Sequence, residues 1–225
     1  IGQMIGVTAL AAVSSFFPVF FFFIAFVIGL GAGASVLIGQ AWGARDVARA
    51  KAVAGTTLSV GLLMGLVIAV FGGAFTTPLL AALGTPPDVL AEATRYARIM
   101  LIAMPGVFVF LISTAMLRGV GDTVTPLLTL LISTTIGMLV TPALIRGWGG
   151  LPQLGVTSGA WGSVLSFLVA TLWLGWRLRR RNSPLAPDAV FLRSMRIDPQ
   201  LLKTVLKVGV PTGVQMIVVA LAEVV

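Results

Sequence analysis

The 225-residue sequence has no cysteine and no histidine, and it has only one tyrosine. Without cysteine the chain has no disulfide, thiolate nucleophile or thiolate metal ligand. Without histidine it lacks imidazole ligands and the side chain that most often serves acid and base catalysis near neutral pH. Paired carboxylates inside apolar segments are missing as well. We therefore expect a protein that is not an enzyme, with no metal site and no organic cofactor.

Charge is scarce too. Charged residues make up 10% of the chain and hydrophobic residues 58%, and the mean hydropathy is +1.07. Residues 99–117 and 123–145 carry no charge at all. A bilayer core of ~30 Å is crossed by ~20 apolar residues in a helix, and backbone groups in lipid must bond within their own segment. The predicted fold class is all-α, a polytopic transmembrane helical bundle.

Glycine, proline and charged turns divide the apolar segments. Pro105 and Gly106 are expected to kink the third helix. Thr125 before Pro126, and Asp198 before Pro199, are each typical of an N-cap followed by proline at the first helical position. We expect a surface lead-in over 1–15, helices at about 16–41, 52–71, 88–117, 125–145, 158–176 and from 199 onward, and a short amphipathic piece over 75–83.

Lysine and arginine are distributed unevenly between alternate loops. The positive-inside rule places the loops at 42–51, 118–125 and 177–200 in the cytoplasm. We expect the membrane to be a plasma membrane, that is, a bacterial inner membrane. Residue 1 then lies outside, so we expect a fragment that lacks at least one earlier helix. The cytoplasmic side receives twelve of these residues (Arg45, Arg49, Lys51, Arg118, Arg177, Arg179, Arg180, Arg181, Arg193, Arg196, Lys203 and Lys207), and the other side receives three (Arg95, Arg98 and Arg146).

Four polar motifs recur at helix ends. They are GASVLIGQAWGARD at 33–46, RGVGDTVTP at 118–126, LGVTSGAW at 154–161 and GVPTGVQ at 209–215. Their order, spacing and sidedness resemble the multidrug and toxic compound extrusion (MATE) family. They match the exit of its second helix, its turn between helices four and five, and the openings of helices six and seven.

This resemblance implies twelve helices in two six-helix lobes, and export of organic cations or other amphiphiles driven by Na⁺ or H⁺ entry. On that map residues 1–180 hold helices two to six of the N-terminal lobe. Residues 181–198 are a cytoplasmic basic linker, and residues 199–225 begin the C-terminal lobe. The implied partners are a small-molecule substrate, amphiphilic or cationic, and the lipid bilayer, not nucleic acid. We expect the full-length protein to be a monomer.

One position departs from the family pattern. Many members carry an Asn and an Asp four residues apart on the fifth helix, and this chain has Gly137 and Thr141 there. The departure argues against coupling through a carboxylate at that point.

Glu223 is the one ionisable residue deep in an apolar helix, and we predict that it couples transport to a cation. The sixteen residues from Lys207 to Glu223 rise ~24 Å at ~1.5 Å each, which reaches the outer half of a ~30 Å core. A carboxylate there costs roughly 2.5–3.5 kcal/mol, and H⁺ or Na⁺ binding would offset that cost. Alternatively, a helix that starts later would place Glu223 at the water boundary.

Other polar and helix-weakening residues are weaker candidates. Gln215 could line a substrate cavity or could bond backbone freed by Pro211. A stripe on the fourth predicted helix could line the cavity or make interhelical hydrogen bonds, and the last predicted helix has a candidate hinge. The stripe is Thr129, Ser133 and Thr141, and the hinge is Gly209, Pro211 and Gly213.

Two further features are structural predictions. Gly29 and Gly33 form a G-x-x-x-G pattern, which favours a close helix packing seam inside the molecule. Arg118 and Asp122 are expected to form an exposed pair in their turn.

Three functions remain to be compared. A secondary antiporter is favoured by the buried glutamate and the proline-broken helices. A lipid-linked oligosaccharide flippase of the same superfamily would need cationic residues inside the bundle to meet pyrophosphate, and the predicted spans contain none. A non-transporting membrane scaffold is the remaining alternative.

Overall fold

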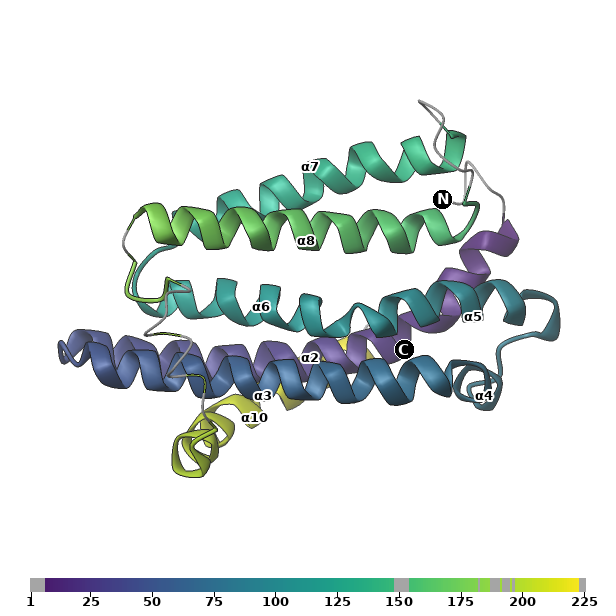
Figure 1. Cartoon of the computed structure of the whole chain (residues 1–225). Helices are drawn as coiled ribbons and strands as arrows, with labels where there is room; N and C mark the ends of the chain where they lie inside the picture. Colours follow the sequence, from purple (N-terminus) through teal and green to yellow (C-terminus); the bar gives the residue numbers. More distant parts are fainter. Residues whose placement is uncertain are drawn as a thin grey trace. The chain divides into compact units, whose positions relative to one another are not determined.

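The computed structural model describes residues 7–147, 154–181, 183–186, 191, 195 and 197–222. Regular secondary structure in these residues is helical, which confirms the all-α prediction. The principal helices are α2 (Val7–Gly43), α3 (Val47–Ala74), α4 (Thr76–Ala82), α5 (Pro87–Ile102), α6 (Met104–Gly119), α7 (Val124–Arg146), α8 (Thr157–Arg180) and α10 (Pro199–Ala222) (Figure 1).

Several helices are long and apolar enough to cross a membrane. In the described part of the chain, α3, α7, α8 and the Val13–Gly43 part of α2 meet that test. α5 and α6 add a fifth span if they are counted together, as two rods bent by 51°. The polytopic transmembrane bundle is thereby confirmed.

The bend between α5 and α6 lies at Ala103, just ahead of Pro105. Proline has no N–H to donate to the carbonyl of Leu101, four residues earlier, so the helical hydrogen-bond pattern is interrupted. Gly65 of α3 lies against the bend, since a Cβ placed on it would stand 2.6 Å from Cα of Pro105. The predicted kink is confirmed, a few residues nearer the N-terminus than Pro105 and Gly106.

Two helices begin earlier than predicted. α2 begins at Val7, so residues 7–15 are not a surface lead-in. Ser15 Oγ donates to the carbonyl of Ala11 at 2.9 Å, which satisfies its hydroxyl within an apolar helix. α3 begins at Val47 and not near 52, because Asp46 Oδ1 accepts the backbone N–H of Arg49 at 2.9 Å and caps the helix.

Aspartates cap two later helices as well. The predicted N-cap at Asp198 is confirmed, because its Oδ1 accepts the backbone N–H groups of Gln200 at 2.8 Å and Leu201 at 3.2 Å. The predicted N-cap at Thr125 is wrong. Asp122 Oδ1 accepts the backbone N–H of Thr125 at 2.9 Å, so Asp122 caps α7, and Thr125 lies inside its first turn.

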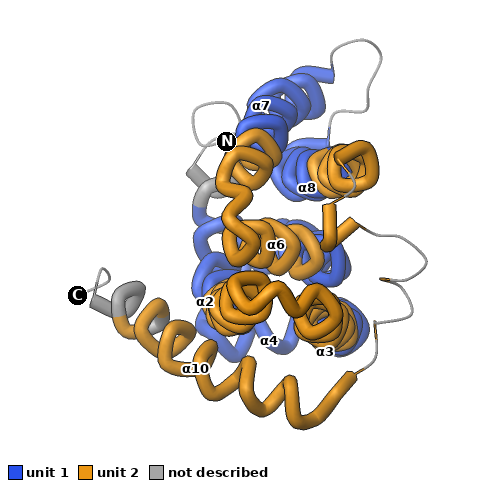
Figure 2. The backbone as a smooth tube through the Cα atoms, turned by 90° about the vertical axis from the view of Figure 1, so that its left-hand side faces the viewer, with its two compact units in different colours: residues 1–21, 64–107, 131–169 blue, residues 22–63, 108–130, 170–225 orange. Residues whose placement is uncertain are grey.

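The chain forms two compact units, coloured separately in Figure 2. Unit 1 comprises residues 1–21, 64–107 and 131–169, and unit 2 comprises residues 22–63, 108–130 and 170–225. In unit 1, Phe16 packs edge-on against Tyr96 with ring centroids 6.1 Å apart, and Leu80 and Leu101 are fully buried. The core of unit 2 includes Leu30, Ile38, Phe108, Phe110, Ile112, Met116 and Leu174. The lobe boundaries expected at 180 and 198 stay a prediction.

Candidate functional site

Within unit 2, α2 and α10 approach each other at glycines (Figure 2). A Cβ on Gly29 would stand 2.6 Å from the carbonyl oxygen of Gly209 and 2.9 Å from the nitrogen of Gly213. A Cβ on Gly33 would collide with the carbonyl of Val205. The two backbones touch only because these positions lack side chains. The packing seam predicted at Gly29 and Gly33 is confirmed, and α10 is the helix that it meets.

This seam includes two of the three predicted hinge residues. Gly209 and Gly213 lie against α2, while Pro211, between them, is exposed and stands inside a continuous α10. Because the same glycines that weaken α10 also form the seam, any bending of α10 would have to take place at its contact with α2. A hinge role for Gly209, Pro211 and Gly213 stays a prediction.

Within unit 1, α7 and α8 form a second seam of small residues. A Cβ on Gly137 would stand 3.2 Å from Ser166 Oγ, and one on Gly162 would collide with Thr141 Oγ1. Gly137 and Thr141 of α7 therefore face Ser166 and Gly162 of α8, four residues apart on each helix. The two positions where the MATE resemblance leads one to look for Asn and Asp serve here as a helix contact.

The hydroxyl stripe on α7 is buried over its first part. Thr129 is fully buried, and its Oγ1 donates to the carbonyl of Thr125 at 2.7 Å. Ser133 is 8% exposed, and Thr141 packs against Gly162. The structure therefore shows an interhelical contact for Thr141 and a bond within its own helix for Thr129. Neither contact tests whether the stripe lines a substrate cavity.

The remaining predicted site residues lie on α10 or after it. Gln215 is exposed on α10 in unit 2. Glu223 lies outside the described residues. The charge-free runs 99–117 and 123–145 leave hydroxyl groups as their principal polar side chains. In the described portion of the chain no group of three or more acidic residues could hold a metal ion.

An electrostatic junction in unit 2 was not foreseen from the sequence. Asp122 Oδ2 accepts the hydroxyl of Thr125 at 2.6 Å, and Thr125 Oγ1 accepts Nε–H of Arg177 at 3.2 Å. Arg177 also stacks on Trp173, with 5.1 Å from Cζ to the ring centroid. Asp122 is half-buried and turns to Thr125, so the exposed Arg118–Asp122 pair is the wrong description of this turn. The aspartate three residues before a threonine was the signal that could have indicated this cap.

The junction keeps Asp122 ionised. Partial burial would raise the pKa of Asp122, but hydrogen bonds from the side chain and backbone of Thr125 and the positive charges of Arg181 and Arg177 outweigh it. Its pKa therefore lies below the ordinary value for an aspartate. This negative charge holds the start of α7 beside the basic end of α8.

A family model described as MatE matches residues 1–143. The chain belongs to the MatE family. Over 224 residues it is 46% identical to the probable multidrug resistance protein YoeA of Bacillus subtilis (strain 168), with 100% of this chain and 48% of that protein covered. It is 28% identical over 196 residues to an FAD transporter of Shewanella oneidensis, covering 87% of this chain and 43% of that one. The resemblance found in the four motifs is confirmed.

Solved structures of MATE transporters share the fold. The crystal structure of MATE in complex with MaD3S superposes with a TM-score of 0.86 at 28% identity, covering 98% of this chain and 48% of that one. The chain thus spans about half the length of the MatE proteins that it matches. The chain therefore belongs to a family of membrane transporters and not to a family of enzymes.

Proposed function

We propose that the full-length protein is a secondary active antiporter that exports organic cations or other amphiphiles in exchange for Na⁺ or H⁺. The similarity to YoeA supports a drug-like, small-molecule substrate. The observation that carries the mechanism is the glycine seam between α2 and α10. On the lobe assignment made from sequence, α2 belongs to the first lobe and α10 opens the second. A contact between bare backbones has no interlocking side chains, so the two helices could rock or slide past each other.

The coupling step is assigned to Glu223. A carboxylate in the membrane core is costly unless it is neutralised, and H⁺ or Na⁺ from outside can do that. A cationic substrate arriving from inside would neutralise the same group, so the two ligands compete and exchange. Gln215, one turn after Pro211 on α10, and the hydroxyls of Thr129, Ser133 and Thr141 would supply neutral polar contacts to the substrate.

The proposed orientation places the loops at 42–51, 118–125 and 177–200 in the cytoplasm. The end of α8 supports it, because Arg177, Arg179 and Arg180 occupy its last turn. Arg180 stacks on Trp176 with its Cζ 4.4 Å from the ring centroid, an arrangement suited to the membrane–water interface. We further propose that the full-length protein works as a monomer in a bacterial plasma membrane.

Anionic substrates are the second candidate, since one similar protein is an FAD transporter. A diphosphate or an oligosaccharide pyrophosphate would need cations inside the spans. The runs 99–117 and 123–145 contain no lysine or arginine, which favours a cationic or neutral substrate. A non-transporting scaffold is the remaining alternative, and it would show no gradient-driven export.

Ethidium efflux tests the proposal directly. Cells that lack their own multidrug exporters would express the full-length protein as wild type, Glu223→Gln or Glu92→Gln, with Na⁺ and pH gradients imposed separately. We expect efflux under one gradient in wild type and in the control Glu92→Gln, and loss of efflux in Glu223→Gln. Efflux that survives Glu223→Gln would remove Glu223 from the coupling step. No efflux under either gradient would favour another substrate or a scaffold.

A further inference from the structure

Unit 2 contains an apolar cavity of about 460 Å³ between α3, α6, α8 and the segment that follows α8. Its wall includes Leu58 of α3, Val109 of α6, and Leu185 and Phe191 from the segment after α8. Leu185 and Phe191 are 7% and 4% exposed, so both of these side chains pack inward. The volume lies in the range of roughly 300–1,000 Å³ that is typical of small-molecule sites.

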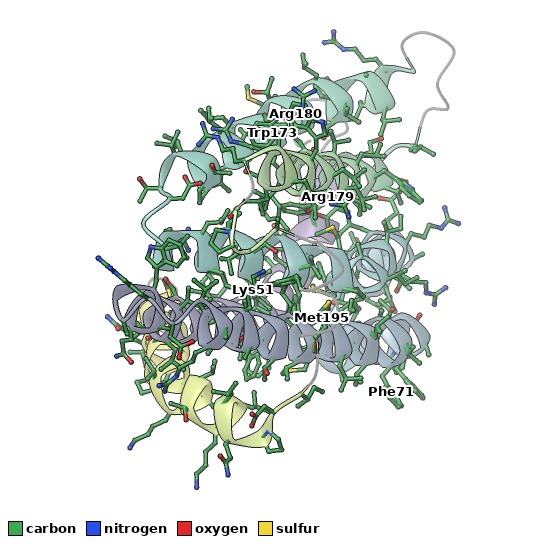
Figure 3. All side chains as sticks on the ribbon, turned by 60° about the vertical axis from the view of Figure 1, so that its left-hand side comes forward. Lys51, Phe71, Trp173, Arg179, Arg180 and Met195 are labelled. Carbon is green, nitrogen blue, oxygen red and sulfur yellow. The ribbon has the colours of Figure 1, made fainter. Side chains whose placement is uncertain are left out.

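A second hollow of about 440 Å³ shares one lining residue with this cavity, Arg179. Its other walls include Trp42 from the end of α2, Lys51 of α3 and Ser183 after α8. Figure 3 labels Lys51 and Arg179 on their two helices, together with Met195, which lines the apolar cavity. Two positive charges and a hydroxyl therefore line the second hollow, and one of these charges, Arg179, also lines the apolar cavity.

We propose that the apolar cavity and the cationic hollow together, here called the amphiphile site, bind one anionic phospholipid. Its phosphate lies beside Lys51 and Arg179, and part of an acyl chain fills the apolar cavity. Trp176, which lines the apolar cavity, and Trp42, which lines the cationic hollow, add amphipathic rings of the kind enriched at the headgroup level. On the proposed orientation, the lipid comes from the cytoplasmic leaflet.

The chemistry of the walls selects this ligand class. Free phosphate would use the two cations but leave the apolar cavity without an apolar ligand. A lipid with a choline headgroup would bring a further positive charge toward Lys51 and Arg179. An anionic headgroup with an acyl chain satisfies both halves of the amphiphile site, since juxtamembrane Lys and Arg attract anionic lipid by about 1 kcal/mol each.

Native mass spectrometry of the full-length protein in detergent tests this proposal, with phosphatidylglycerol, phosphatidylcholine and glycerol phosphate as separate probes. We expect one tightly retained phosphatidylglycerol in wild type. The double variant Lys51→Gln/Arg179→Gln should weaken its binding by about thirtyfold, the equivalent of two such charges. Arg180→Gln is the control for the Arg179 change, because it removes one positive charge from the next residue, whose side chain lines neither hollow.

A second variant separates lipid binding from simple charge attraction. Gly175 lines the apolar cavity, so the side chain of Gly175→Leu should occupy part of it and weaken phosphatidylglycerol binding without changing any charge. In parallel, phosphatidylglycerol with brominated acyl chains should quench tryptophan fluorescence more strongly in wild type than in Trp176→Phe. The Trp176→Phe variant must elute like wild type on gel filtration for this comparison.

Three results would overturn the proposal. The first is that phosphatidylcholine or glycerol phosphate binds as tightly as phosphatidylglycerol. The second is that Arg180→Gln loses as much phosphatidylglycerol binding as the double variant. The third is that Gly175→Leu binds phosphatidylglycerol as tightly as wild type. The measurement is made on resting protein. The test of the amphiphile site is therefore independent of whether the protein exports ethidium.

Discussion

Nε of Arg177 donates to Oγ1 of Thr125 across 3.2 Å, which joins the last turn of α8 to the first turn of α7 within unit 2. Thr125 is fully buried and is also bound to Asp122 through both its hydroxyl and its backbone N–H. One threonine thus links a helix cap to an arginine 52 residues away. This junction makes Asp122 and Thr125 structurally important residues of a turn that the sequence alone presents as an exposed loop.

The cap at Asp122 predicts a graded loss of stability. Asp122→Ala removes the acceptor for the N–H of Thr125 and is expected to cost about 1 kcal/mol of unfolding free energy. Asp122→Asn keeps a good capping side chain and should cost less. Thermal unfolding of the full-length protein in detergent measures both, and equal midpoints for Ala, Asn and wild type would show that the cap is unimportant.

The lowered pKa of Asp122 predicts a dependence on pH with a definite sign. A carboxyl whose pKa is lower in the folded protein contributes stability above its unfolded pKa of ~3.9, and this contribution is lost as pH falls through the folded value. The difference in melting temperature between wild type and Asp122→Asn should therefore be constant from pH 7 to 5 and shrink below about pH 4. A difference that instead grows on acidification would contradict the assigned direction.

The seam between α2 and α10 predicts opposite outcomes for two glycines. Gly29→Ala places a Cβ 2.6 Å from the carbonyl of Gly209, and such overpacking is expected to cost about 1–3 kcal/mol. Gly213→Ala places its Cβ 3.4 Å from the carbonyl of Ala25, an ordinary contact, and should be tolerated. Gel filtration and melting temperature distinguish the two variants. Similar behaviour of both would mean that the helices do not touch at Gly29.

The seam between α7 and α8 predicts a rescue. Gly162→Ala drives a methyl group into Thr141 and should destabilise the protein by about 1–3 kcal/mol. Thr141→Ala in the same chain removes the colliding hydroxyl. The double variant should therefore lose less stability than the two single variants lose when their losses are added. A double-mutant cycle of melting temperatures measures this coupling. Additive effects would show that Thr141 points elsewhere.

The sequence patterns predicted features that depend only on residues close together in the sequence. The proline bend near Pro105, the cap at Asp198 and the capacity of Gly29 and Gly33 for close packing all follow from local backbone chemistry. The start of α2 differs from the predicted lead-in over 1–15, because a polar residue such as Ser15 can bond its hydroxyl back within an apolar helix and does not mark the start of that helix. The cap of α7 was missed because Asp122 and Thr125 are both good capping residues.

Other features depend on the tertiary fold and could not be derived from spacing. The G-x-x-x-G pattern in α2 does not name α10 as its partner, nor do Gly137 and Thr141 indicate Gly162 and Ser166. The amphiphile site draws its walls from α2, α3, α6, α8 and the segment after α8, none of which has a lipid-binding pattern of its own.

The bend at Ala103 also fits the chain to the thickness of its membrane. The two 16-residue helices α5 and α6, with Ala103 between them, would form a straight rod of roughly 50 Å at ~1.5 Å per residue. A bilayer measures only ~40–45 Å including its headgroups. Because a 51° bend shortens the reach of this pair along the membrane normal, the charged first turns of α5 can stay in the headgroup region. A straight rod would instead carry the charged first turns of α5 beyond the headgroups into water, because the charge-free run 99–117 alone, at ~29 Å, already spans the ~30 Å core.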